Sequence, residues 1–308
     1  MTDSESFGEA EYLGWQLLVQ LKRRSDEQIP RSKFVKLLCI TDREIEQKYD
    51  YDIGTPRYWY MYGELVDEHE YTGKFYNAPS AIGWEGQQYL PKRSLTEDDF
   101  EVGQEAKEYI DTQSESVVHR FGGKNVEEIK EYQYEQYAPC PFIQNYSELR
   151  WYLKVSGIDR EQTGIHDFGV DVTPPSKVVE EYLDLMLETF PSEYEEMKSL
   201  YLRWDDTVRM MLEQDPDLGE VQEFLDEFII TLSQKELRFQ HNSHINEETL
   251  QSWTESASQQ EREFRESVRA KRDNLLSNRS PSPALDSVSE DFSSSVMSEM
   301  NEMLTKDR

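Results

Sequence analysis

The residues best suited to chemistry lie in one polar segment, residues 236–244. It holds His241 and His244, whose spacing of three would place both imidazoles on one side of a helical turn. Glu247 or Glu248 could then supply a third metal ligand. The segment has no HExxH pattern and no cysteine beside it, so the sequence predicts neither a metal site nor a bound cofactor.

The same segment contains a second spacing, in which five residues separate Arg238 from His244 at a predicted helix junction. This spacing resembles the arginine and histidine motif of the HEPN superfamily of helical-bundle ribonucleases. The resemblance implies that His244 acts on the ribose 2'-hydroxyl or its leaving group, while Arg238 stabilises charge on the phosphate. Phe239 stands where that family often has a polar residue. A polar helix junction without chemistry explains the same residues.

Motifs of nucleotide and acyl-transfer chemistry are missing from the sequence. The chain has no GxGxxG, Walker or GxSxG pattern. Gly122-Gly123-Lys124 lacks the upstream glycine and the following Ser or Thr that a phosphate-binding loop needs. These absences favour an interaction or regulatory protein over an enzyme.

The first half of the chain has the pattern of a helical domain with an irregular insert. Apolar residues at helical spacing predict helices over residues 8–22 and 30–49. Between residues 50 and 90, glycines and prolines separate short aromatic runs, which predicts turns and one hairpin around residues 70–76. We expect a mixed helical first domain over residues 1–155.

The second half of the chain has the pattern of a helical bundle. After a connection over residues 156–172, three amphipathic helices follow closely, and a more polar helix covers residues 247–276. Short connections favour antiparallel neighbours, so we expect an antiparallel bundle over residues 173–276. A Ser-rich, disorder-prone tail with an amphipathic segment follows over residues 277–308. The expected fold class is mainly α.

Acidic residues dominate the composition along the whole length. The 308 residues include 63 Asp and Glu against 33 Lys and Arg, a formal net charge of -30. An acidic surface keeps a protein hydrated and dispersed when molar salt screens other charges, so we expect a halophilic, cytoplasmic protein. No apolar run is long enough to span a bilayer, and the start of the chain lacks the pattern of a signal peptide.

One local cluster of positive charge lies where the first two predicted helices meet. Such a basic corner could contact a nucleic-acid backbone, although no side chain can be placed to read bases. A DNA-binding transcriptional regulator is therefore a further alternative, and a salt-bridged surface is the simpler interpretation. The candidate residues are Lys22, Arg23, Arg24, Arg31, Lys33 and Lys36.

Two stretches of the first domain carry a family resemblance. They are FVKLLCITDRE at residues 34–44 and YMYGELV at residues 60–66. Residues 34–66 resemble the Panacea antitoxin-type domain, in which a Lys-Leu-Leu helix reaches an acidic end and a Tyr-Gly-Pro-Val type turn follows. Here Glu64 replaces the proline. The resemblance implies a domain that neutralises or recognises another protein by binding, with three shared, non-catalytic positions: Lys36, Asp42 and Gly63.

The whole chain also resembles a group of proteins from halophilic archaea and their plasmids or viruses. That resemblance implies the same saline cytoplasm and adds no mechanism. It is consistent with the acidic composition. We therefore expect a halophilic protein whose function is decided by what it binds.

Two apolar features are candidates for binding a protein partner. The first is the aromatic run Tyr58, Trp59, Tyr60 and Tyr62. The second is the apolar stripe of residues 285–304, with candidate contacts at Phe292, Val296 and Met300, unless the tail docks on its own bundle. The sequence thus predicts a non-enzymatic, antitoxin-like interaction protein with a protein partner and no membrane contact. A ribonuclease using Arg238 and His244 is the main alternative.

Replacing Phe292 and Val296 with aspartate tests the tail interpretation. The Phe292→Asp/Val296→Asp variant should lose its partner, because two charged side chains cannot enter an apolar contact without a large desolvation cost. Affinity capture in molar KCl measures this, with thermal unfolding of the purified variant as the control. Capture at the wild-type level would contradict the tail interpretation.

Overall fold

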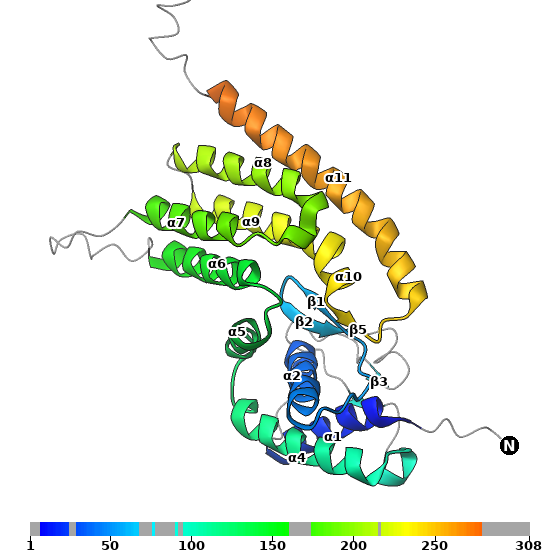
Figure 1. Cartoon of the computed structure of the whole chain (residues 1–308). Helices are drawn as coiled ribbons and strands as arrows, with labels where there is room; N and C mark the ends of the chain where they lie inside the picture. The colour runs from blue at the N-terminus through cyan, green and yellow to red at the C-terminus, as the bar shows by residue number, and fades with distance from the viewer. Residues whose placement is uncertain are drawn as a thin grey trace, which may run out of the picture.

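The computed structural model describes residues 7–24, 29–67, 76–77, 90–91, 95–159, 174–214 and 217–278. Most of these residues are helical, which confirms the mainly α fold class. Figure 1 shows two groups of helices that meet at a small sheet. The order of its antiparallel strands is β2 (Gly63–Val66), β1 (Arg57–Tyr60) and β5 (Asn242–Ser243).

The first group of helices packs around a core below the sheet in Figure 1. At its centre α2 contacts the other three helices, and its buried Phe34, Leu38 and Ile45 follow the helical spacing of the sequence. The helices predicted over residues 8–22 and 30–49 are confirmed. The group contains α1 (Glu9–Arg24), α2 (Arg31–Tyr49), α4 (Gln104–Phe121) and α5 (Val126–Tyr137), with the short turn η2 (Glu97–Asp99). A separate strand pair is β3 (Tyr76–Asn77) with β4 (Leu90–Pro91).

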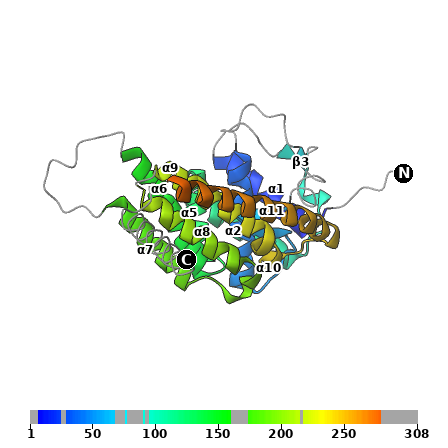
Figure 2. The same ribbon diagram turned by 90° about the horizontal axis from the view of Figure 1, so that it is seen from above.

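The second group forms a bundle around its own core. Its long last helix lies along the outside of the bundle and begins beside the sheet, as Figure 1 shows, and Figure 2 shows the same helix from above. A single π-helical turn, η5 (Ser233–Leu237), interrupts the helical path before the sheet. The other members are α6 (Pro141–Asp159), α7 (Pro175–Glu188), η4 (Ser192–Tyr194), α8 (Glu195–Leu212), α9 (Leu218–Leu232), α10 (Arg238–Gln240) and α11 (Glu247–Asn278).

The boundary between the two groups lies earlier than the sequence predicts. Residue 155, the expected end of the first domain, is inside α6. The buried Phe142, Tyr146 and Leu149 of α6 belong to the second core, where α6 packs against α7 and α9. The change of core therefore falls within α5, whose Ile129 belongs to the first core and whose Tyr134 belongs to the second. The apolar face of α6 packs against α7 and α9, which come later in the chain. A local sequence pattern therefore does not reveal which core α6 joins.

The hairpin of the sheet is formed by the aromatic run itself. Tyr60 pairs with Gly63 at the turn between β1 and β2. The hairpin predicted around residues 70–76 lies almost wholly outside the described residues, and the observed one precedes it. Alternation along β1 buries Arg57 and Trp59 on one face of the strand.

A buried ion network ties this hairpin to α2. Arg57 donates from Nε to Asp42 at 2.5 Å and from Nη1 to Glu64 at 3.0 Å. A further bond joins Arg57 to Glu46, and Arg43 donates to the same Glu64 at 2.7 Å. Burial raises the pKa of Asp42, and the adjacent Arg57 opposes that rise. Several carboxylates around one guanidinium offset the cost of burying its charge.

Lys36 holds the turn of the hairpin from below. Its ammonium donates to the carbonyl of Tyr62 and, at 3.0 Å, to Oε1 of Gln133. Gly63 has a φ of 91°, and a Cβ there would lie 2.7 Å from that Gln133 oxygen and 3.2 Å from the Lys36 Nζ. The positions shared with the Panacea resemblance, Lys36, Asp42 and Gly63, therefore all fasten the hairpin to α2.

Replacing Gly63 with alanine should destabilise the fold. The change adds a steric clash to a backbone that L residues rarely adopt, so we expect the free energy of unfolding to fall by about 2–4 kcal/mol. Gly54, with a φ of 80° and nothing within 4 Å of an added Cβ, is the matched control. Gly54→Ala should introduce only backbone strain, which lowers the free energy of unfolding by about 1 kcal/mol. Equal losses in denaturant titrations would show that the Gly63 contact does not constrain the turn.

The buried Lys36 should make the free energy of unfolding depend on pH in the alkaline range. Burial lowers its pKa from 10.5 to about 8, so between those values the folded state binds fewer protons than the unfolded state. Stability from this group therefore increases as the pH rises through that window. As the pH rises through this window, the wild type should gain up to about 3 kcal/mol of unfolding free energy relative to Lys36→Met, which has no ionisable group at this position. A difference that stays constant across the window would contradict the burial of a lysine with a lowered pKa.

Candidate functional site

Arg238, the first residue of the predicted ribonuclease pair, is enclosed between α10 and α11. Its Nε donates to the carbonyl of Gln234 at 3.0 Å, and its Nη2 donates to the carbonyl of Trp253 at 2.7 Å and to Ser256 Oγ at 2.9 Å. The guanidinium also lies over the rings of Phe239 and Trp253. Desolvation lowers the pKa of Arg238 to about 10. Its donors join two helices and are not presented to a phosphate.

His244 faces a different element. Its Nε2 lies 2.9 Å from both carboxylate oxygens of Asp52, in the loop after α2. The backbone of His244 has a φ of 57°, which turns the chain from β5 toward α11. Arg238 and His244 thus have separate partners on separate elements. The polar-junction interpretation describes both residues, and the geometry gives the ribonuclease interpretation no support.

His241 also makes a structural contact. Its Nε2 lies 2.7 Å from the hydroxyl of Tyr194, its carbonyl accepts from the Trp59 amide at 2.9 Å, and burial lowers its pKa. Within the described ranges, no group of three or more His, Cys, Asp and Glu residues is arranged to hold a metal ion. His241 and His244 therefore fasten the junction between the two groups of helices.

The basic corner of the sequence mainly caps a helix. Nη1 of Arg24 donates to two carbonyls in the last turn of α4, and Nζ of Lys33 donates to two carbonyls just beyond it, each bond at 2.8 Å. Cations are favourable at this end of a helix. Lys36 is buried under the hairpin. The remaining nucleic-acid candidates are the half-buried Arg31 and the exposed Lys22 and Arg23.

The aromatic run is largely internal, which corrects its expected exposure. Trp59 is 1% exposed and belongs to the second core. Tyr58 packs against Trp253 with ring centroids 4.8 Å apart, and Tyr60 is half-buried beside it. Only Tyr62, at the turn, is 45% exposed. Outside the described residues lie the tail candidates Phe292, Val296 and Met300.

A groove over α6 is an open concavity lined by aromatic side chains. It encloses about 590 Å³, and Gln144, Glu148 and Trp151 of α6 form its floor. One wall is α5, which contributes Glu131, Tyr134 and Glu135, and Tyr182 of α7 forms the other. We call this feature the α6 groove. In Figure 1, α5, α6 and α7 follow one another up the side of the molecule.

Trp151 is the most exposed aromatic side chain of the α6 groove, at 56%. The inner face of α6 is buried in the bundle core, so the folding of this helix does not require a second apolar face. An exposed tryptophan inside a concave surface is typical of a binding site.

The lining of the α6 groove contains carboxylates and no cation. Nearby cations are already paired: Lys130 and Lys154 lie 2.5 and 3.5 Å from Glu127, and Arg150 lies 2.8 Å from Asp226. Lys130 and Lys154 share the single carboxylate of Glu127, and the groove lining itself has a negative formal charge. Within the described ranges, no ion pair includes the three exposed carboxylates that line it, which are Glu131, Glu135 and Glu148.

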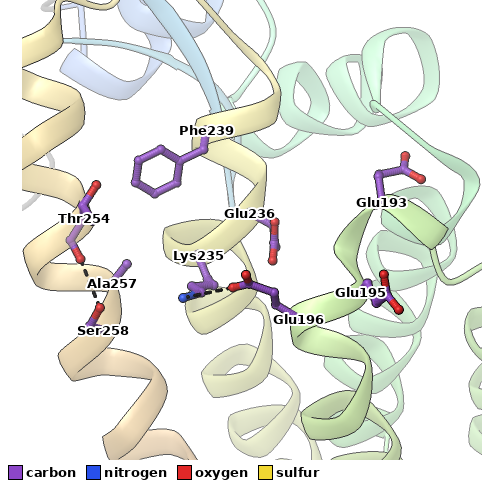
Figure 3. A pocket seen from close by; sticks show the side chains of 9 residues that line it. All are labelled: Glu193, Glu195, Glu196, Lys235, Glu236, Phe239, Thr254, Ala257 and Ser258. Carbon is purple, nitrogen blue, oxygen red and sulfur yellow. Dashed lines mark hydrogen bonds and ion pairs between the residues drawn. The ribbon is translucent and has the colours of Figure 1, made fainter.

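A second cleft, of about 450 Å³, lies between the start of α8, η5 and α11, as Figure 3 shows. Lys235 points toward Glu196 at 3.4 Å and also pairs with Glu261 at 3.2 Å. Glu236 accepts from Gln240 at 2.9 Å, and burial raises its pKa. The two hydroxyls in the cleft donate to carbonyls of their own helix. This second cleft contains its own cation, in contrast to the α6 groove.

Comparisons with known proteins add no further assignment. No family model, curated protein or solved structure matches the chain. Among the described helices, none is both long enough and apolar enough to cross a membrane. The geometry of the α6 groove is therefore the main guide to function.

The sequence contained a signal for the α6 groove that our sequence interpretation missed. At roughly 100° per residue, Trp151 is about 180° around α6 from Phe142, which lies on the buried face. A large aromatic residue opposite the core face of a helix indicates a surface contact. Recognising it required knowing that α6 belongs to the bundle.

Proposed function

We propose that this chain is a non-catalytic interaction protein that recognises another protein through the α6 groove. The observation that carries the proposal is the exposure of Trp151 in a concave aromatic surface. The antitoxin-type resemblance of residues 34–66 agrees with a protein that acts by binding. The acidic composition agrees with a halophilic setting for that interaction.

Covering Trp151 would supply a useful part of the binding free energy. A tryptophan side chain presents on the order of 250 Å² of surface. With 56% of it exposed, complete burial by a partner would contribute about 3 kcal/mol. A contribution of that size is typical of the central residue of a protein interface.

Both groups of helices contribute to the α6 groove. Its α5 wall packs against α2 and β2 in the first group as well as against α6 in the second. The antitoxin-type segment, which includes α2 and the hairpin, therefore positions one wall of the proposed site. This arrangement gives the resembling segment a role in recognition without placing its shared residues in contact with the partner.

Catalysis has less support from the geometry. Arg238 and His244 point to different elements, and the second cleft holds carboxylates beside Lys235 without a nucleophile and base in contact. An interaction protein needs only a shaped, accessible surface. The α6 groove meets that requirement.

Replacing Trp151 with alanine should strongly weaken binding of the partner. We expect Trp151→Ala to weaken binding roughly 30-fold or more, because it deletes the largest exposed aromatic surface of the groove. Leu202→Ala on α8, where the leucine is 44% exposed and outside the groove, is the matched control. Capture in molar KCl, followed by calorimetry with the purified partner, measures both variants.

Both variants should remain folded and lose similar amounts of unfolding free energy, at most about 3 kcal/mol, because each side chain is only about half buried. Loss of the partner from Trp151→Ala and its retention by Leu202→Ala would support the proposed site. Equal binding by both variants would contradict it.

A further inference from the structure

We infer, resting on the function proposed above, that the occupant of the α6 groove is a cationic amphipathic segment of the partner protein. Its Lys or Arg side chains would lie against Trp151 and Tyr182 while their charges meet the groove carboxylates. Aromatic faces attract cations, and long basic side chains cover apolar surface with their methylene stems. The carboxylates concerned are Glu131, Glu135 and Glu148.

The electrostatics of the α6 groove favour such an occupant. Its carboxylates form no ion pair within the described ranges, whereas the neighbouring Lys130, Lys154 and Arg150 already have acidic partners. A cation entering the groove therefore gains attraction without displacing an existing pair. The second cleft differs because Lys235 already lies beside its carboxylates.

The length of the α6 groove suits a short amphipathic segment. Its floor runs from Gln144 to Trp151 along α6, which corresponds to about 10 Å at the rise of an α-helix. Two turns of a partner helix, or a few residues of an extended segment, cover that distance. Apolar side chains of the segment would then contact Trp151 from above.

The tail of the chain itself does not have the required charge. Residues 285–304 have an apolar stripe at helical spacing, but they include five acidic residues and no Lys or Arg. Like charges would repel this segment from the groove carboxylates. The tail sequence therefore provides a matched anionic probe for the test.

The experiment compares two dye-labelled synthetic peptides that share one apolar stripe. One has the sequence of residues 285–304, and the other carries Asp286→Lys, Glu290→Lys, Asp291→Lys, Glu299→Lys and Glu302→Lys. Fluorescence anisotropy with the full-length protein in about 0.2 M and about 2 M KCl measures binding. We expect the lysine peptide to bind, more tightly at the lower salt, and the acidic peptide to bind at least tenfold more weakly.

Matched variants separate the groove from the general negative charge of the protein. The groove variant is Glu131→Gln/Glu135→Gln/Glu148→Gln. The control variant, Glu255→Gln/Glu263→Gln/Glu266→Gln on α11, changes the net charge equally at exposed sites away from the groove. We expect the groove variant to bind the lysine peptide roughly tenfold more weakly and the control variant to stay within about twofold of the wild type.

The outcomes distinguish this inference from the proposed function. Equal weakening by both variants, no binding of the lysine peptide, or equal binding of the two peptides would each overturn the cationic occupant. If Trp151→Ala still loses the natural partner in that case, the groove remains the binding site and only the charge of its occupant is wrong. If Trp151→Ala keeps the natural partner, the proposed function itself fails.

Discussion

Arg57 carries a positive charge into the buried junction between α2 and the hairpin, where Asp42, Glu46 and Glu64 surround it. A buried guanidinium without these partners would cost several kcal/mol, so the network favours this placement of the hairpin on α2 over placements that separate the charges. Lys36 adds a second constraint by holding the turn from below. The remainder of the molecule is organised around the hairpin in that position.

The hairpin joins the two groups of helices because it contributes to both cores. Trp59 and Met61 belong to the core of the bundle, whereas Val66 belongs to the core of the first group. Its β1 strand also packs against η5 and α10, next to the Arg238 contacts with α11. With the hairpin and α2 in place, α5 is held beside α6. The α6 groove thus depends on a charge network outside the groove.

Local patterns in the sequence predicted the helices well and the contacts poorly. The periodic apolar residues of α1, α2 and α9 decide their helical state locally, so these elements could be placed in advance. Arg24 and Lys33 resembled a nucleic-acid surface because their carbonyl partners near the end of α4 are distant in sequence. Trp59 resembled a surface aromatic for the same reason. Exposure and pairing are set by tertiary packing, which periodicity does not encode.

The most direct test of partner recognition at the α6 groove is an NMR titration that observes the indole N–H signals of the six tryptophans. Trp151→Phe assigns the groove signal, and Trp204, whose indole donates to the carbonyl of Phe224 inside the core, serves as the internal reference. Addition of the captured partner should shift or broaden the Trp151 signal and leave the Trp204 signal in place. An unchanged Trp151 signal at saturating partner would contradict the assignment of the α6 groove as the binding site.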